Sequence, residues 1–218
     1  MSARLIDILD LRDVDLTRLY ETLNGYEPMS LLTHTELVRL IADESLVSYE
    51  DALLPFPLEQ VNGASVDLTL GDEVLIESGS NVIDLARKQA PMMRRLEPNT
   101  DGSYELRPGD FVLAHTREVF KMPANVAGHY MLKSSLARAG LQHLFAGFAD
   151  PTWQGCLTLE LCNATRDQTL VLRPGQAIGQ MVFFRGSSAV PEAASYARRG
   201  QYQGDRTVTQ SKGLRCGA

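Results

Sequence analysis

Hydrophobic positions follow a helical period near the start of the chain and a period of two from about residue 62 onward. In "LIDILDLRDVDLTRLYETLNGY", leucines recur at three- and four-residue spacings until Asn24-Gly25, which predicts a helix that ends there. A second helix is expected in "THTELVRLIADESL", where apolar residues share one face behind an N-cap at Thr33 or Thr35. The first part of the chain is therefore expected to be helical.

The later segments predict short strands. In "ASVDLTLGDEVLIE", Val66, Leu68 and Leu70 alternate with polar residues, as in a half-buried strand. Further strands are expected in "DFVLAHTREVFKM", "GCLTLELCN", "QTLVL" and "QAIGQMVFF". The Pro-Gly pairs of "LRPGD" (106–110) and "LRPGQ" (172–176) are typical of type II turns. Short strands joined by such turns predict a mainly β protein with an antiparallel sandwich or barrel.

Composition and charge narrow the class of partner. A chain of 218 residues can bury a core without disulfides or a metal. The formal net charge of −6 disfavours a nucleic-acid partner, because phosphate binding needs a basic face. Three cysteines without framework spacing predict reduced thiols. With no signal peptide and no apolar run of membrane-spanning length, a soluble cytoplasmic protein without a membrane partner is expected.

Two familiar kinds of catalytic motif are incomplete or absent. "HTE", at His34 to Glu36, matches H-x-E, half of the zinc deaminase signature, but P-C-x-x-C and H-E-x-x-H are missing. A catalytic zinc needs its full ligand set, so no zinc is expected and His34 is interpreted as part of a helix's first turn. Neither glycine-rich phosphate loop is present, which disfavours a P-loop enzyme or a dinucleotide-binding protein.

Two interpretations stay open for "KSSLARAGL" (133–141). Ser134, Arg138 and Leu141 have the spacing of one helical face. If the serines begin a short helix, its free N–H groups, with Lys133 and the hydroxyls, could bind an anion. The other interpretation is an ordinary helix with a serine cap and a solvated arginine.

Two interpretations also stay open for Glu160. Along "CLTLELC", three leucines share one face, and Thr158, Glu160 and Cys162 share the other. Glu160 could lie on a solvated outer face, and Asp150, just before Pro151, would then be a turn residue. A cysteine on either side of Glu160 along its face is unusual for a wet surface, which favours a sequestered carboxylate suited to proton transfer.

Four segments together resemble the dCTP deaminase branch of the trimeric dUTPase superfamily. The strongest is "KSSLARAGLQHLFAGFADPTWQGCLTLELCN" (133–163), which looks like the serine-arginine motif, aspartate-proline-aromatic turn and Leu-Glu strand of that family. "NGASVDLTLG" (62–71), "LRPGQAIGQMVFF" (172–184) and "YARRGQYQGDR" (196–206) resemble its N-terminal signature, late hairpin and C-terminal motif. Four motifs in the same order are specific to the family.

The resemblance implies a distorted antiparallel β-barrel or jelly-roll subunit of a homotrimer, with active sites between subunits. It implies a dUTPase-like β domain at 30–185 and a tail at 186–218 that closes over the nucleotide. The N-terminal helical extension at 1–29, predicted from its periodicity, lies outside the resemblance. The reaction it implies is zinc-independent hydrolysis of dCTP to dUTP and ammonia. The substrate would carry Mg²⁺ on its triphosphate, without direct protein ligands.

Residue by residue, the resemblance implies three catalytic side chains. Glu160 matches the general base, Ser134 the hydroxyl that helps to hold the attacking water, and Arg138 the cation that balances the site. The backbone carbonyl of Ala146 would also touch the water. The remaining nucleotide contacts that it implies are Lys133, Ser135, Asp150, Thr158, Leu159, Gln180, Tyr196, Gln201, Tyr202 and Asp205.

The chain departs from the family pattern in its tail. Gln201 stands where a phosphate-binding lysine is usual and Asp205 where a glutamine is, which should weaken binding of a triphosphate. The main expectation is a dCTP deaminase that forms dUTP. The alternative is a bifunctional enzyme that also cleaves dUTP to dUMP and pyrophosphate, with Asp150 helping to activate a second water. A non-catalytic nucleotide-binding or interaction protein on this fold is a third hypothesis.

Overall fold

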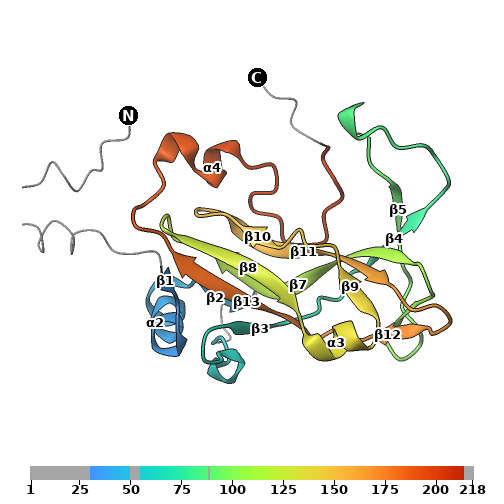
Figure 1. Cartoon of the computed structure of the whole chain (residues 1–218), viewed down its shortest axis with the longest axis horizontal. Coiled ribbons are helices and arrows are strands. Elements are labelled where there is room, and N and C mark those ends of the chain that lie inside the picture. The colour runs from blue at the N-terminus through green and yellow to red at the C-terminus, as the bar shows by residue number, and fades with distance from the viewer. Residues whose placement is uncertain (1–29, 50–54, 88, 214–218) are drawn as a thin grey trace, which may run out of the picture.

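Two antiparallel sheets form the body of the computed structural model, which describes residues 30–49, 55–87 and 89–213 (Figure 1). The first sheet has the order β1 (Ser30–Leu31), β13 (Ala177–Arg185), β8 (Val126–Leu132) and β10 (Phe148–Ala149), with β3 (Val66–Thr69) also paired to β13. The second has the order β5 (Met92–Arg95), β4 (Leu75–Ser78), β7 (Phe111–Lys121), β11 (Gln154–Asn163) and β9 (Leu141–His143), with β2 (Val47–Tyr49) also on β7. A separate pair joins β6 (Tyr104–Leu106) to β12 (Leu170–Leu172). The prediction of a mainly β fold with antiparallel sheets is confirmed.

Helical structure is sparse among the described residues. The α-helices are α2 (His34–Glu44), α3 (Ser134–Arg138) and α4 (Tyr196–Arg199), and the 3-10 turns are η2 (Leu58–Gln60), η3 (Leu85–Arg87) and η4 (Glu192–Ala194). Thr33 caps α2 in a capping box, in which its N–H donates to the Glu36 carboxylate at 3.1 Å. The helix predicted within 33–46 is therefore confirmed, whereas the extension predicted at 1–29 lies outside the described residues.

Strand β11 has the predicted alternation. Leu157, Leu159 and Leu161 are buried in the core, whereas Thr158 and Glu160 on the other face are only half-buried. Fixing one face in the core determines the direction of the other, because a slip of one residue would reverse every side chain. The register of β11 on β7 therefore fixes Glu160 on the face opposite the leucines.

Both predicted Pro-Gly turns are present. Gly109 and Gly175 have φ values of 83° and 81°, the left-handed conformation that the third residue of a type II turn requires. Hydrogen bonds of 3.0 and 3.1 Å, from the N–H of Asp110 to the Arg107 carbonyl and from the N–H of Gln176 to the Arg173 carbonyl, close the turns.

The structure corrects the predicted extent of the helix in "KSSLARAGL". Helix α3 ends at Arg138, and Leu141 belongs to strand β9. Gly140 has a φ of 97°, which glycine tolerates and which ends the helical conformation between the two elements. Strand β8, at Val126–Leu132, was not predicted, because glycine and histidine interrupt its apolar pattern.

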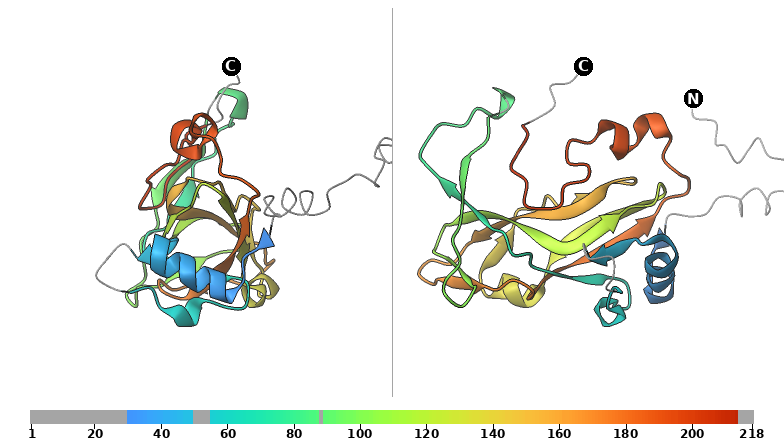
Figure 2. Two further views of the ribbon diagram at one scale, coloured as in Figure 1. Left: turned by 90° about the vertical axis from the view of Figure 1, so that its left-hand side faces the viewer. Right: turned by 180° about the vertical axis from the view of Figure 1, so that it is seen from behind.

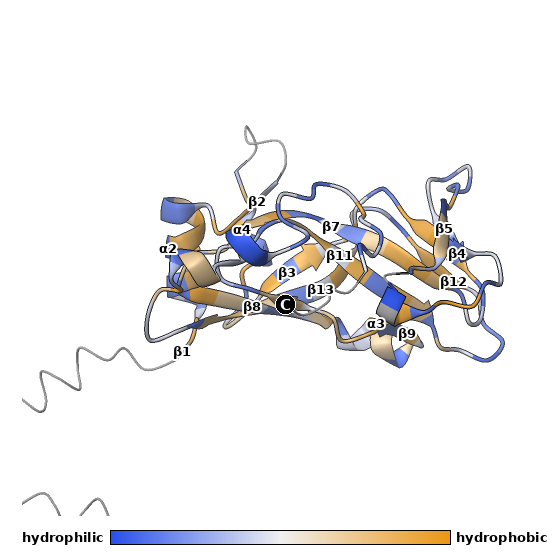
Figure 3. Cartoon of the chain, turned by 90° about the horizontal axis from the view of Figure 1, so that it is seen from above, coloured by the Kyte–Doolittle hydropathy of each residue, from blue (hydrophilic) through white to orange (hydrophobic). Residues whose placement is uncertain are grey.

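The two sheets enclose one hydrophobic core, and the tail crosses outside it. The ring of Phe120 packs against Trp153 and Phe183, with centroid distances of 5.8 and 6.5 Å. From behind and from the side, the tail with α4 lies over one edge of the body, away from α2 and α3 (Figure 2). Hydrophobic colour follows the strands of both sheets, whereas α4 is hydrophilic (Figure 3). No helix among the described residues is long and apolar enough to cross a membrane.

Candidate active site

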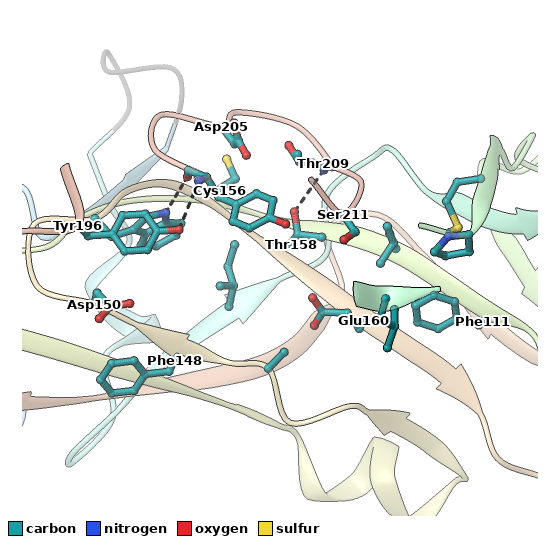
Figure 4. Close-up of a pocket in the computed structure, with 18 of the residues that line it drawn as sticks. Phe111, Phe148, Asp150, Cys156, Thr158, Glu160, Tyr196, Asp205, Thr209 and Ser211 are labelled. Atoms are coloured by element: carbon teal, nitrogen blue, oxygen red, sulfur yellow. Dashed lines mark hydrogen bonds between the residues drawn. The ribbon is translucent and has the colours of Figure 1, made fainter. Parts of the chain in front are cut away.

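A cavity of about 490 Å³ lies along β11, between the end of β9, the loop that leads into β10, and the tail (Figure 4). Phe111 and Leu113 of β7, and Met93 of β5, give it an apolar wall. The predicted site residues that line it are Ala146, Asp150, Thr158, Glu160, Tyr196, Tyr202 and Asp205. Segments more than fifty residues apart in sequence therefore meet in one cavity, whose polar groups come mainly from β11 and the tail.

The cavity borders an edge of β11 where a stretch of backbone is open. On that edge, the Glu160 carbonyl accepts a hydrogen bond from the Leu144 N–H (3.2 Å), and the Cys156 N–H donates to the Asp205 carbonyl (2.8 Å). Alternate residues of a strand direct their backbone groups to the same edge, so those of Thr158 also point there. No backbone hydrogen bond occupies the Thr158 edge within the described ranges. The backbone N–H and C=O of Thr158 can therefore form hydrogen bonds with the polar edge of a planar ring.

The side chain of Thr158 is held by the tail. Its Oγ1 accepts a hydrogen bond from the N–H of Thr209 at 3.3 Å, which the dashed line in Figure 4 marks. Leu159, which was expected to lie along a base, instead has a fully buried side chain in the core. Its backbone faces Ala114 of β7 rather than the cavity, because it alternates with Thr158.

The Glu160 carboxylate has two unlike oxygens. Its Oε2 is buried without a hydrogen-bond partner and lies 3.4 Å from Nε2 of His143, the last residue of β9. The Glu160 side chain as a whole keeps 27% of its surface exposed and lines the cavity. A carboxylate in this setting is shielded from bulk water on one side and open to a ligand on the other.

Sequence reasoning did not identify His143 or Tyr130. The His143 ring packs edge-on against the Tyr130 ring, with centroids 4.6 Å apart, and the Tyr130 hydroxyl and His143 Nε2 are both buried without a hydrogen-bond partner. Burial raises the pKa of Tyr130 far above its ordinary range, with further contributions from the Glu118 and Glu160 carboxylates. A histidine in a three-residue strand and a tyrosine in an unpredicted strand carry no periodic signal.

Asp150 lies on the same cavity wall as Tyr196. Partial burial raises the pKa of Asp150, and burial together with the nearby Asp150 carboxylate raises that of Tyr196. The Tyr196 hydroxyl accepts a hydrogen bond from the Tyr202 N–H at 3.3 Å, and the Tyr202 carbonyl accepts one from the Trp153 indole N–H at 3.0 Å. These bonds tie the tail to the turn that carries Asp150.

The tail also pairs directly with β11. Gly155 and Asp205 form a parallel bridge, and a Cβ at Gly155 would lie 2.6 Å from the Asp205 carbonyl oxygen. Only glycine allows this close approach. The Asp205 carboxylate, which stands where the family usually has a glutamine, lies 3.3 Å from the Lys212 ammonium. Gln201 does not line the cavity, and its side-chain amide donates to the Gly213 carbonyl at 3.2 Å.

The remaining predicted residues lie outside the cavity. Ser134, Ser135 and Arg138 are exposed on α3. The ammonium of Lys133 pairs with the Asp67 carboxylate at 2.5 Å. A second group of polar residues does not line the cavity, and it consists of Asp67, Lys133, Ser134, Ser135, Arg138 and Gln180. Gln180 belongs to it as the register partner of Asp67 on β13. Within one chain, Ser134 and Arg138 are thus not brought together with Glu160.

The chain is similar to known proteins in sequence and in fold. Residues 31–186 match the family described as dCTP deaminase-like. Proteins named "dCTP deaminase, dUMP-forming" include one from Beutenbergia cavernae, 40% identical over 165 residues (74% of this chain and 85% of that protein), and one from Nocardioides sp., 36% identical over 181 residues (79% and 94%). The solved 2'-deoxycytidine 5'-triphosphate deaminase from Agrobacterium tumefaciens matches with a TM-score of 0.56 and 20% identity. That match covers 73% of this chain and half of the solved one, and it supports the fold alone.

Proposed function

The chain belongs to the dCTP deaminase-like family, and from this premise we propose that it deaminates dCTP and cleaves the resulting dUTP to dUMP and pyrophosphate. The proposal differs from the main sequence expectation, in which dUTP is the final product, because the similar proteins are named dUMP-forming. The observation that carries the catalytic part is the half-buried Glu160 carboxylate in the cavity, beside the open backbone of Thr158.

The deamination step needs one carboxylate that acts first as a base and then as an acid. Glu160 takes a proton from water while the oxygen adds to C4 of cytosine, and the carboxyl passes that proton to N3. The carboxylate then takes the second proton from the C4 hydroxyl and gives it to the leaving amine, so that ammonia departs and the uracil carbonyl forms. The Glu160 carboxylate suits both transfers because it lines the cavity and keeps part of its surface open to a ligand.

We propose that a neighbouring subunit of a homotrimer completes each cavity. Ser134 and Arg138 are exposed on their own chain and do not line its cavity. Exposed apolar side chains occur on this stretch of chain: Phe148, which lines the cavity, is 60% exposed, and Phe145, the residue before the lining residue Ala146, is 88% exposed. Apolar groups of this size on a monomer are typical of an interface. A partner's α3 placed there would bury them and bring a hydroxyl and a cation to Glu160.

The second step is proposed to use Asp150. Its carboxylate lines the same cavity as Glu160 and is only partly buried, so it can orient a water toward the α-phosphate of dUTP. The substrate would be the magnesium complex of the nucleotide, because the charge of a triphosphate needs neutralising as the pyrophosphate leaves.

Product analysis tests the proposal. Purified protein is incubated with Mg²⁺ and dCTP, dUTP or dCMP in separate reactions, and the nucleotides are resolved by chromatography. We expect dUMP and pyrophosphate from both dCTP and dUTP. Accumulation of dUTP from dCTP would remove the second step, and tight binding without any product would overturn the catalytic function. Faster turnover of dCMP than of dCTP would contradict triphosphate recognition by the tail.

A further inference from the structure

Three buried polar atoms without hydrogen-bond partners gather behind the proposed catalytic carboxylate. They are Glu160 Oε2, His143 Nε2 and the Tyr130 hydroxyl, and they come from β11, β9 and β8. Among the described residues, only one other buried side-chain atom, His115 Nε2, shares this state. Buried polar groups are rarely left unpaired, because each has given up its hydrogen bonds to water. Three such atoms around one carboxylate indicate a functional arrangement.

The surrounding packing fixes the position of these groups. The His143 side chain is 5% exposed, Tyr130 is 2% exposed, and their rings meet edge to face. A Cβ at Gly179 would lie 2.1–2.4 Å from Tyr130 ring atoms and hydroxyl, so the strand β13 leaves room for this ring only because it has glycine there. The two rings therefore form a rigid support.

We propose that His143, held in place by Tyr130, is a positioning residue for the Glu160 carboxylate. The Nε2–H group of His143 donates to Oε2 and holds that oxygen in the buried interior. The other oxygen, Oε1, is then directed to the cavity, where water and the base bind. The inference rests on the proposed function of Glu160 and adds to it the group that orients the carboxylate.

Tyr130 contributes in two ways. Its ring, packed against the His143 ring, sets the tilt of the imidazole, and its hydroxyl stays neutral because burial and the nearby carboxylates raise its pKa. A neutral hydroxyl buried near these groups adds no second negative charge near Glu160. Orientation of this kind matters because a misplacement of about 1 Å in a reacting group can cost about a hundredfold in rate.

The test compares His143→Leu, His143→Gln and Tyr130→Phe with the unaltered protein. We expect the kcat for ammonia release from dCTP to fall about tenfold to a hundredfold in His143→Leu, with KM changed by less than about twofold. Glutamine keeps an N–H donor of similar reach, so His143→Gln should recover part of kcat. Tyr130→Phe should lower kcat by a smaller factor.

Matched controls separate orientation from general damage. Tyr104→Phe removes a buried hydroxyl that donates to the Asp72 carbonyl at 2.6 Å, outside the cavity, and should leave kcat unchanged. Melting temperature and binding of dCTP are measured for every variant.

The controls also define what would overturn the inference. If His143→Leu folds and retains the kcat of the unaltered protein, the inference is wrong while the proposed function stands. If His143→Leu does not fold, the other two variants decide. The inference is then wrong if His143→Gln and Tyr130→Phe both have the same kcat as Tyr104→Phe. Absence of product from the unaltered protein would overturn the proposed function itself.

Discussion

The Lys212 ammonium lies 3.3 Å from the Asp205 carboxylate and 4.8 Å from the centre of the Tyr202 ring, at the point where the tail borders the cavity. Its Nζ also donates to the Gln201 carbonyl at 2.8 Å. The acidic residue that departs from the family pattern is therefore neutralised by a cation seven residues further along the same tail. The pair removes the physical objection to a triphosphate ligand that Asp205 alone would raise.

Lys212→Met should raise the KM for dCTP about two- to fivefold, because it leaves Asp205 uncompensated near the phosphates. Asp205→Asn should lower the KM or leave it unchanged, since it frees the ammonium for a phosphate. In a double-mutant cycle, the KM of the double variant should be lower than the two single effects combined would give, because no uncompensated anion remains. Additive effects of the two substitutions would contradict the coupling, and steady-state kinetics at constant ionic strength measures it.

Glu160→Gln should leave the fold intact and lower ammonia release from dCTP more than a hundredfold, the scale expected for loss of a general base. The substitution keeps the shape of the side chain but removes its capacity to accept and return a proton. Circular dichroism and the melting temperature check the fold, and a coupled ammonia assay measures the rate. A variant with near-normal ammonia release would show that Glu160 is not the base.

Mixing two inactive variants tests whether active sites form between subunits. Arg138→Ala keeps Glu160, and Glu160→Gln keeps Arg138, so a hybrid trimer can place one intact copy of each at a shared interface. Co-expression of the two, with distinguishable tags, should restore about a quarter of the unaltered activity if each site draws the two residues from different chains. Hybrids that remain inactive would mean that one chain supplies both residues.

The sequence carried enough information to predict the fold and the residues of β11 and the tail that line the cavity. Alternation along β11 fixes the direction of Glu160, because three leucines must enter the core. The alternation does not reveal that α3 lies away from the cavity. Arg138 and Asp150 are close in sequence, and the distance between them in space depends on the path of β9 and β10. His143 was missed for a related reason, because a single buried histidine leaves no periodic pattern in the sequence.

The buried Glu118 carboxylate should make stability depend on pH. Thr69 donates to it through its N–H (2.9 Å) and hydroxyl (2.7 Å), yet burial dominates and raises its pKa above the ordinary value of 4.5. The folded state then binds a proton more tightly than the unfolded chain, so the free energy of unfolding falls as pH rises through the window above 4.5. Urea unfolding across this window measures the slope.

Glu118→Gln provides the comparison for that slope. The variant cannot titrate at this position, so the fall in its free energy of unfolding above pH 4.5 should be shallower than in the unaltered protein. Asp150, whose pKa burial also raises, contributes in the same sense in both proteins. Asp101, whose pKa is lowered by hydrogen bonds from Ser103 and Arg173, contributes only at lower pH. Identical slopes would contradict the assignment to Glu118.

Asp150→Asn should separate the two proposed reactions. Deamination uses Glu160, so the variant should still release ammonia from dCTP, whereas loss of the carboxylate that orients the second water should slow formation of dUMP about a hundredfold. The expected result is accumulation of dUTP, followed over time by chromatography with dCTP and with dUTP as separate substrates. Asparagine keeps the size of the side chain beside Tyr196, so the cavity wall is preserved. Equal loss of ammonia and dUMP would instead assign Asp150 to binding of the nucleotide that both steps share, and unchanged formation of dUMP would exclude it from the second step.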